Sequence, residues 1–189
     1  NSIATVTDGM VRGVAAGTVT ITATERDGSR KKAKCIVRVL DEVPVTSVVI
    51  AQQEMTMKRG DSAKLKYSVL PSDTSDSLKY ASDNNRVAKI SSNGVVKAIG
   101  TGSCTITILA SGGVSSTVTI HVVEMNRSTL TMRQYDTETL WVNGTTNTVT
   151  WYSSNARVAS VDNTGKVTGR GKGTTYIYAY VDGCKMGCR

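Results

Sequence analysis

The sequence holds few side chains that could carry acid–base or nucleophilic chemistry. Its single histidine, His121, stands on a segment in which Val118, Ile120 and Val122 alternate with polar residues. Alternation of this kind predicts that the three apolar side chains face a core and that the imidazole faces solvent. An enzymatic site requires several converging groups, not one isolated base. No catalytic residue is therefore assigned, and the chain is not expected to be an enzyme.

The carboxylates that come nearest to a metal-ligand cluster are Asp73, Asp76 and Asp83. They stand in stretches rich in Ser and Asn, where an Asp side chain accepts hydrogen bonds from the nearby backbone of a turn. The Asp-x-Asp-x-Asp-Gly run of a calcium-binding loop is missing. We expect these carboxylates to stabilise turns, and we expect neither a metal nor a cofactor.

The four cysteines, Cys35, Cys104, Cys184 and Cys188, match no zinc-ligand spacing. Cys35 and Cys104 stand on the inward register of their segments, so both are predicted to be small core side chains. Cys184 and Cys188 would lie about 13 Å apart in an extended strand, beyond disulfide reach, although a turn could bring them together. Free thiols are favoured for this pair.

The formal charge of +8 permits attraction to anionic partners. The densest basic cluster contains Arg26, Arg30, Lys31, Lys32 and Lys34. Such a run is usually the solvated surface of a hairpin, and a weak patch for an anionic polymer is the alternative. No aromatic residue that could stack on a base stands in this hairpin, so nucleic-acid binding is not expected.

Four tyrosines are predicted to share one exposed face near the end of the sequence: Tyr152, Tyr176, Tyr178 and Tyr180. The last three alternate with inward-facing Thr175, Ile177 and Ala179, and Tyr152 follows Trp151, which is predicted to fill the core. An exposed tyrosine row could bind sugar rings or a protein partner. The alternative is aromatic packing that stabilises the sheet, or cover by an adjacent domain.

The composition indicates which elements must position these side chains. The chain has 189 residues, of which 39% are hydrophobic and 20% charged, with no Phe and two Pro. Thr, Val, Ser and Gly dominate, and this balance favours short strands joined by polar turns, so the predicted class is all-β. No apolar run is long enough to cross a bilayer, and residues 1–20 lack a secretion signal. Any export signal or anchor is expected outside these residues.

One sequence unit recurs three times, each copy containing a glycine turn followed by a second glycine and an alternating strand. The three copies of its first part are residues 3–11, 87–96 and 158–167, and the second parts start at Gly17, Gly102 and Gly173. The period of two predicts strands with one buried face. Two such sheets must pack together to hide their apolar faces, which gives a sandwich.

The repeat predicts three domains. Residues 1–41 are interpreted as the C-terminal part of a first repeat, residues 45–124 as a complete second repeat, and residues 125–189 as a third repeat that lacks its closing strand. A short linker, residues 41–44, separates the first two. We expect the chain to be part of a longer array with units on both sides.

The motif pattern of the second repeat resembles the bacterial Ig-like domain of group 2. It is carried by Gly60, Pro71, Tyr80-Ala81-Ser82, Val87-Ala88-Lys89-Ile90, Gly94-Val95-Val96 and Gly102 to Ile106. The third copy repeats it from Trp151 to Ile177, but it is shorter and has no Pro at the turn. The resemblance implies tandem immunoglobulin-like sandwiches in adhesins, surface-layer and wall-associated proteins, exported polysaccharide enzymes and phage tail proteins, and no activity of its own.

These observations predict a non-enzymatic extracellular array that acts as a spacer, presentation or adhesion segment of a bacterial surface or phage protein. The rival hypothesis is a glycan-binding accessory module of a secreted polysaccharide-degrading enzyme. The expected partners are neighbouring Ig-like domains of the same chain and a cell-wall glycan, a host glycan or a surface protein. Neither nucleic-acid binding nor membrane insertion of these residues is expected.

Overall fold

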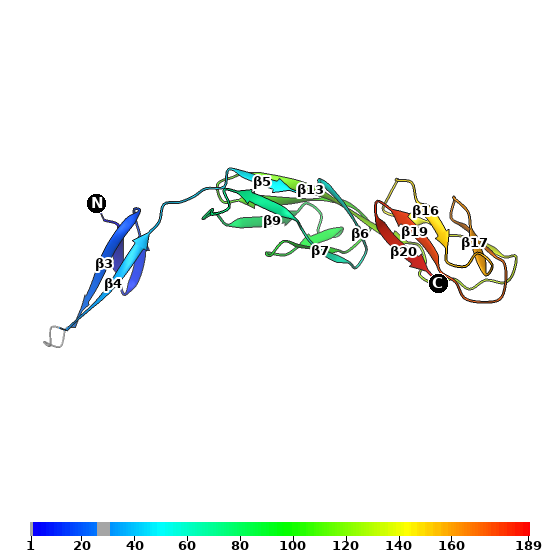
Figure 1. Ribbon diagram of the computed structural model, residues 1–189, viewed down its shortest axis with the longest axis horizontal. Helices are drawn as coiled ribbons and strands as arrows, with labels where there is room; N and C mark the ends of the chain where they lie inside the picture. Colours follow the sequence, from blue (N-terminus) through cyan, green and yellow to red (C-terminus); the bar gives the residue numbers. More distant parts are fainter. Residues whose placement is uncertain (1, 26–30) are drawn as a thin grey trace.

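The computed structural model describes residues 2–25 and 31–189, and within them all regular secondary structure is β-strand. This confirms the all-β prediction. The strands form three groups that follow one another along the longest axis of the molecule (Figure 1). In the described residues no helix is long and apolar enough to cross a membrane.

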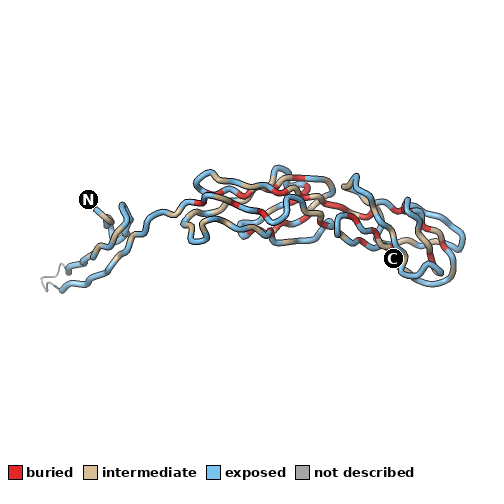
Figure 2. Tube along the Cα trace, turned by 45° about the horizontal axis from the view of Figure 1, so that its top comes forward, coloured by how far each residue is buried: buried red, intermediate tan, exposed pale blue. Residues whose placement is uncertain are grey.

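The first repeat consists of two antiparallel hairpins, β1 with β2 and β3 with β4. Their strands are β1 (Ala4–Thr7), β2 (Met10–Gly13), β3 (Gly17–Thr24) and β4 (Lys32–Val39). No described residue of this repeat is buried (Figure 2). Apolar side chains such as Met10 and Ile36 are 77% and 74% exposed, because no further sheet among the described residues covers the hairpins.

The prediction that Cys35 is a core side chain is wrong, because Cys35 is exposed. Cys35 does stand on the register predicted to face inward, since it pairs with Ile21 across the β3–β4 hairpin. Burial of that register requires an opposing sheet, and the described part of the first repeat does not supply one.

The second repeat has nine strands around one hydrophobic core. They are β5 (Ser47–Ile50), β6 (Glu54–Lys58), β7 (Ser62–Lys64), β8 (Tyr67–Leu70), β9 (Leu78–Ser82), β10 (Ala88–Ile90), β11 (Val95–Ala98), β12 (Gly102–Ala110) and β13 (Ser115–Met125). Strands β9, β12 and β13 form one layer in this order, and β6 joins it parallel to β13. Strands β10, β11 and β7 form another layer, and β5 pairs with β8.

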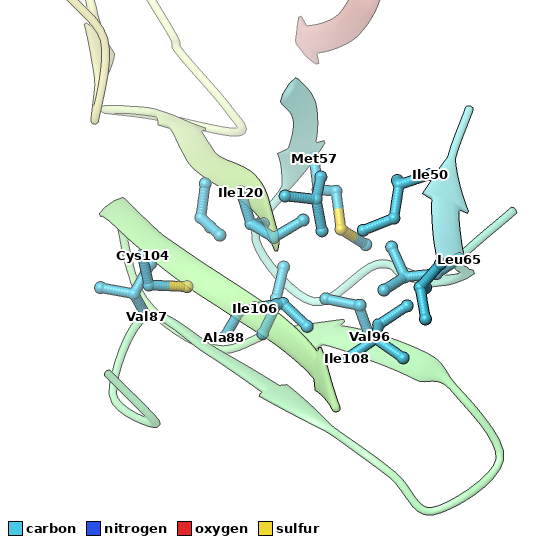
Figure 3. Packing of buried hydrophobic residues seen from close by; sticks show 14 of the residues in the cluster. Ile50, Met57, Leu65, Val87, Ala88, Val96, Cys104, Ile106, Ile108 and Ile120 are labelled. Atoms are coloured by element: carbon cyan, nitrogen blue, oxygen red, sulfur yellow. The ribbon is translucent and has the colours of Figure 1, made fainter. Parts of the chain in front are cut away.

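The alternation of β12 and β13 builds the core of the second repeat. Ile106 and Ile108 on β12 and Val118, Ile120 and Val122 on β13 are at most 1% exposed. Figure 3 shows the side chains of Ile106 and Ile120, from the paired strands β12 and β13, in one cluster with those of Val96 on β11 and Met57 on β6. Each fully buried side chain of this size contributes about 1.5 to 3 kcal/mol relative to leaving it in water.

Cys104 is 4% exposed and lies in this core, which confirms the prediction for this cysteine.

The third repeat has seven strands and a core of its own. They are β14 (Thr137–Thr139), β15 (Val142–Asn143), β16 (Thr150–Ser153), β17 (Ala159–Val161), β18 (Lys166–Gly169), β19 (Ile177–Val181) and β20 (Cys184–Cys188). β14-β18-β17 form one sheet and β16-β19-β20 the other, and β15 pairs with β13. Leu140, Val167, Ile177, Ala179 and Val181 lie among the buried residues of this core.

The end of the third repeat differs from the expectation of a missing closing strand. β20 pairs antiparallel with β19 in the register that sets Ile177 opposite Cys188. The second repeat sets Ile106 opposite Val118, so β20 is the counterpart of the beginning of β13. The predicted domain boundaries themselves stay a prediction.

Candidate functional site

The four tyrosines predicted to share one face lie on the outer side of the β16-β19-β20 sheet. β16 and β19 pair so that Tyr152 stands opposite Tyr178 and Thr150 opposite Tyr180. Tyr152, Tyr176 and Tyr180 are 56%, 43% and 37% exposed, and Tyr178 between them is half-buried. We call Tyr152, Tyr176, Tyr178 and Tyr180 the tyrosine face.

Three of these rings are nearly parallel. The ring centroids of Tyr176 and Tyr178 are 5.9 Å apart with 9° between their planes, and those of Tyr152 and Tyr178 are 6.4 Å apart with 10° between their planes. Aromatic pairs at such distances stabilise one another by about 0.5 to 1.5 kcal/mol. The structure thus supports both hypotheses for the row, because the rings pack on one another and three of the four remain open to solvent.

The inward-facing residues of the same strands hold the tyrosines outward. Ile177, Ala179 and Val181 are at most 4% exposed. Trp151 alternates with Tyr152 and packs against the third core, as predicted, although it is half-buried and not fully enclosed. Directly after β16 and directly before β19, the Ser154 N–H donates to the Tyr176 carbonyl at 2.9 Å, so the pairing continues to Tyr176.

Sequence reasoning missed two residues that complete this site, Lys185 and Gly187. β20 places Lys185 opposite Tyr180 and Gly187 opposite Tyr178. The Lys185 ammonium lies 3.8 Å from the ring centroid of Tyr178 and 5.6 Å from that of Tyr180. A Cβ atom on Gly187 would stand 3.2 Å from the Tyr178 ring, so the glycine leaves the space that this ring occupies.

A signal for Lys185 was present in the sequence. Asp182 and Gly183 separate two short segments, and Asp-Gly is a strong indicator of a two-residue hairpin turn. Both residues adopt the positive φ angles that this turn requires, 48° and 76°. Recognising the hairpin would have placed Lys185 beside the tyrosine row.

The second repeat has no such face at the equivalent positions. Its β12 and β9 pair Thr107 with Ala81, where the third repeat pairs Tyr178 with Tyr152. Thr105 and Leu109 stand where the third repeat has Tyr176 and Tyr180. Of the second and third repeats, only the third therefore has the aromatic row.

The turn carboxylates bind backbone and hydroxyl groups. Asp76 accepts hydrogen bonds from the Ser111 hydroxyl and, at 2.8 Å, from the Val45 N–H. These donors lower the pKa of the Asp76 carboxyl below its usual value. Asp83 accepts from the Thr105 N–H at 2.9 Å. In residues 2–25 and 31–189 no group of three His, Cys, Asp or Glu side chains could hold a metal ion.

His121 lies on the side of β13 away from the core, and its side chain is 30% exposed. Its Nδ1 atom is 2.8 Å from the Ser103 hydroxyl, and its Nε2 atom is 3.9 Å from a Glu54 carboxylate oxygen. These are neighbours across paired strands, as expected for the outer register of a sheet.

The cysteines and the basic cluster lie apart from the tyrosine face or behind it. All four thiols are free, and Cys184 and Cys188 stand at the two ends of β20, as predicted for an extended strand. Burial raises the pKa of the Cys104, Cys184 and Cys188 thiols. In the basic cluster Lys31, Lys32 and Lys34 are exposed in the first repeat, whereas Arg26 and Arg30 lie outside the described residues.

A cavity of about 430 Å³ opens beside the third core, between residues 129–134 and residues 173–177. The Leu130 N–H donates to the Arg189 carbonyl, and the Arg189 N–H donates to the Ser128 carbonyl. In the second repeat the corresponding space is occupied by the part of β13 that pairs with β6.

Two family models match the chain, the bacterial Ig-like domain (group 2) at residues 44–122 and the intimin immunoglobulin-like domain at residues 133–180. Similar proteins include the kappa-carrageenase of Pseudoalteromonas carrageenovora, 40% identical over 67 residues, which are 35% of this chain and 17% of that protein. The Ig-like virion protein of Serratia phage KSP90 is 30% identical over 158 residues, which are 72% of this chain and 60% of that protein.

The chain thus spans less than two thirds of the length of both relatives. Among solved structures, the bacterial integrin-binding protein invasin is similar with a TM-score of 0.46 and 13% identity, over 94% of this chain and 45% of that one. The group 2 match covers the complete core of the second repeat, from Val45 to Val122. Residues 44–122 therefore match the bacterial Ig-like domain of group 2, as the motifs of the second repeat predicted.

Proposed function

We propose that the chain is a non-enzymatic segment of an extracellular bacterial surface protein or phage particle, in which it spaces and presents neighbouring domains. One observation carries this proposal, which is the uninterrupted course of β13 from the second core into the third. Val118, Ile120 and Val122 belong to the second core, whereas Val123 and Met125 belong to the third. No linker separates the two cores.

Paired backbone holds this junction on both sides. β6 pairs with residues 119–123 of β13, and β15 pairs with Glu124 and Met125. The Arg59 guanidinium lies 3.0 Å from the Glu124 carboxylate. Bending at this point would break strand pairing and expose core residues, so the junction is expected to be stiff.

A second contact joins the two repeats away from β13. The Asp182 carboxylate accepts hydrogen bonds from Asn147 at 2.8 Å and from Thr56 at 3.4 Å. Thr56 belongs to the second repeat and Asn147 to the third. Similarity to an Ig-like virion protein over most of the chain supports a structural role in a surface or particle.

Small-angle X-ray scattering of the chain tests the spacer role. We expect the scattering of residues 45–189 to fit one extended rigid body, and an otherwise identical chain with four glycines inserted after Glu124 to fit only a mixture of interdomain angles. Equal flexibility of the two chains would contradict the proposal.

The tyrosine face favours a second candidate function, a glycan-binding accessory module of a secreted polysaccharide-degrading enzyme. Three exposed rings beside one another offer apolar surface to the C–H faces of sugars. Similarity to part of a kappa-carrageenase supports this context. A screen of the chain against immobilised polysaccharides tests it, with Tyr176→Thr/Tyr178→Thr as the comparison. Retention that the double variant loses supports glycan binding, and retention equal in both proteins contradicts it.

A further inference from the structure

Lys185 is a charged group on the edge strand beside the tyrosine face. Its ammonium is held over the Tyr178 ring at 3.8 Å, a geometry in which the ring quadrupole attracts a cation. In the part of the chain that the structure describes, no carboxylate lies within ion-pair distance of Lys185. The nearest acidic residue along the chain, Asp182, instead accepts hydrogen bonds from Asn147 and Thr56.

The other outward-facing residues of this sheet add only one further charge, and it is also positive. Lys185, Gly187 and Arg189 alternate with buried Met186 and Cys188, so Arg189 stands on the same side as Lys185 and is exposed. The outward-facing residues of β16 and β19 are Thr and Tyr. The face thus combines uncharged aromatic surface with a positive edge along β20.

We propose that the tyrosine face binds an acidic polysaccharide, with the sugar rings against Tyr152 and Tyr176 and the anionic substituents against Lys185 and Arg189. The proposal rests on the glycan-binding function and specifies its ligand class. An unneutralised ammonium beside exposed rings attracts a carboxylate, sulfate or phosphate group, since a charge-assisted hydrogen bond is stronger than a neutral one. A neutral sugar would leave the ammonium unpaired at the binding surface.

A polymer fits this surface better than a single small molecule. None of the four tyrosines lines the cavity of about 430 Å³, which lies between residues 129–134 and 173–177 and is bordered by Arg189. Lys185 on β20 and Arg189 directly after it follow the edge of the sheet, alongside Tyr178 and Tyr180 on β19 and Tyr176 directly before it. A chain with an anionic group on successive sugars could contact rings and cations along the same direction.

The proposal is tested by binding of the 189-residue chain to three polymers of equal length: dextran, carboxymethyl-dextran and dextran sulfate. The three share one polysaccharide backbone and differ only in the substituent on it. Lys185→Gln is the test variant. Lys89→Gln is its matched control, since it removes the same charge from an exposed site on β10 of the second repeat. Affinities are measured by calorimetry near physiological salt, and circular dichroism checks that each variant is folded.

We expect a charged polymer to bind and neutral dextran to bind more weakly. Lys185→Gln should weaken charged-polymer binding about tenfold, the value of one charge-assisted hydrogen bond, while Lys89→Gln leaves it unchanged. Preference for the carboxymethyl or the sulfate polymer then identifies the anionic group. Tyr152→Ala, which introduces the residue of the matching position Ala81, should weaken binding to every polymer that binds.

Two results would overturn the anionic ligand class while leaving glycan binding in place. One is equal affinity for neutral and charged dextrans. The other is an equal loss in Lys185→Gln and Lys89→Gln, which would indicate dispersed attraction to a basic protein. Failure of all three polymers to bind would overturn both this inference and the glycan-binding function.

Discussion

Gly144 lies directly against the carbonyl group of Val122, across the junction between the second and third repeats. A Cβ atom added to Gly144 would stand 2.1 Å from the Val122 oxygen and 3.1 Å from the backbone nitrogen of Gly102. Gly144 also has a φ angle of +87°, which side chains rarely adopt. The turn after β15 can therefore dock on the second repeat only if position 144 has no side chain.

Replacing Gly144 with Ala should separate the two repeats. The clash and the positive φ together should lower the free energy of unfolding by about 3 kcal/mol, and one cooperative transition should become two. Gly113→Ala is the control, because Gly113 has a φ angle of +90° but open space around its Cβ position. That change should cost only about 1 kcal/mol. Thermal unfolding followed by calorimetry measures both, and equal effects would contradict the docking role.

Residues 45–124 should fold when expressed alone. The core cluster from Val45 to Val122 is contained within this range, so its apolar surface is buried without help from the other repeats. Circular dichroism should give a β-type spectrum and one cooperative melting transition. A helical spectrum, or the absence of a transition, would contradict the predicted domain.

The two tryptophans should differ in their contribution to stability. Trp151 packs against the third core, and its ring fills the space beside Gly165. Trp151→Ala should therefore cost about 3 kcal/mol. Trp141 is 53% exposed, so Trp141→Ala should cost less than about 0.5 kcal/mol. Urea unfolding of the two variants measures the stability, and iodide quenching of their remaining tryptophan measures its exposure. If the fluorescence of Trp151 is quenched more strongly than that of Trp141, the strand register is shifted by one residue.

The double variant Tyr176→Thr/Tyr178→Thr should remain folded. It removes two stacked pairs and the contact of Lys185 with the Tyr178 ring, which together are worth about 1.5 to 4 kcal/mol. The matching positions of the second repeat, Thr105 and Thr107, show that this sheet register accepts Thr. Urea unfolding monitors the stability, and complete unfolding of the variant would assign the row a purely structural role.

Stability of the second repeat should fall in acid through Asp76. Its pKa is lowered in the folded protein, first by the Ser111 hydroxyl and then by the Val45 N–H. A lowered folded pKa means that the contribution is present above the ordinary value of 3.8 and is lost as pH falls through the folded value. The stability difference between the wild type and Asp76→Asn, measured by urea unfolding, should therefore shrink below about pH 4. A pH-independent difference would contradict this assignment.

Period-two alternation predicted the parts of the fold that depend on one strand at a time. It placed Val118, Ile120 and Val122 inward, and it placed Tyr176 and Tyr180 outward, where the structure has them. It could not decide the burial of Cys35, because that depends on a second sheet and not on the strand itself.

Features that depend on two elements were missed for the same reason. Val122 and Val123 are adjacent and both fully buried, which breaks the alternation, because each side chain enters a different core. Lys185 lies beside Tyr178 only because the Asp182–Gly183 turn folds β20 back on β19. Neither relationship is visible in the pattern of a single segment.

The parallel pairing of β6 with β13 determines how the second repeat carries mechanical load. If the chain is pulled from its two ends, tension enters this repeat near Val45 and leaves through the end of β13 at Met125. Residues 54–58 and 119–123 are then drawn in opposite directions along their length, so the hydrogen bonds between them are loaded in shear and must rupture together. An antiparallel hairpin loaded at its open end would instead lose its bonds one at a time, under a smaller force.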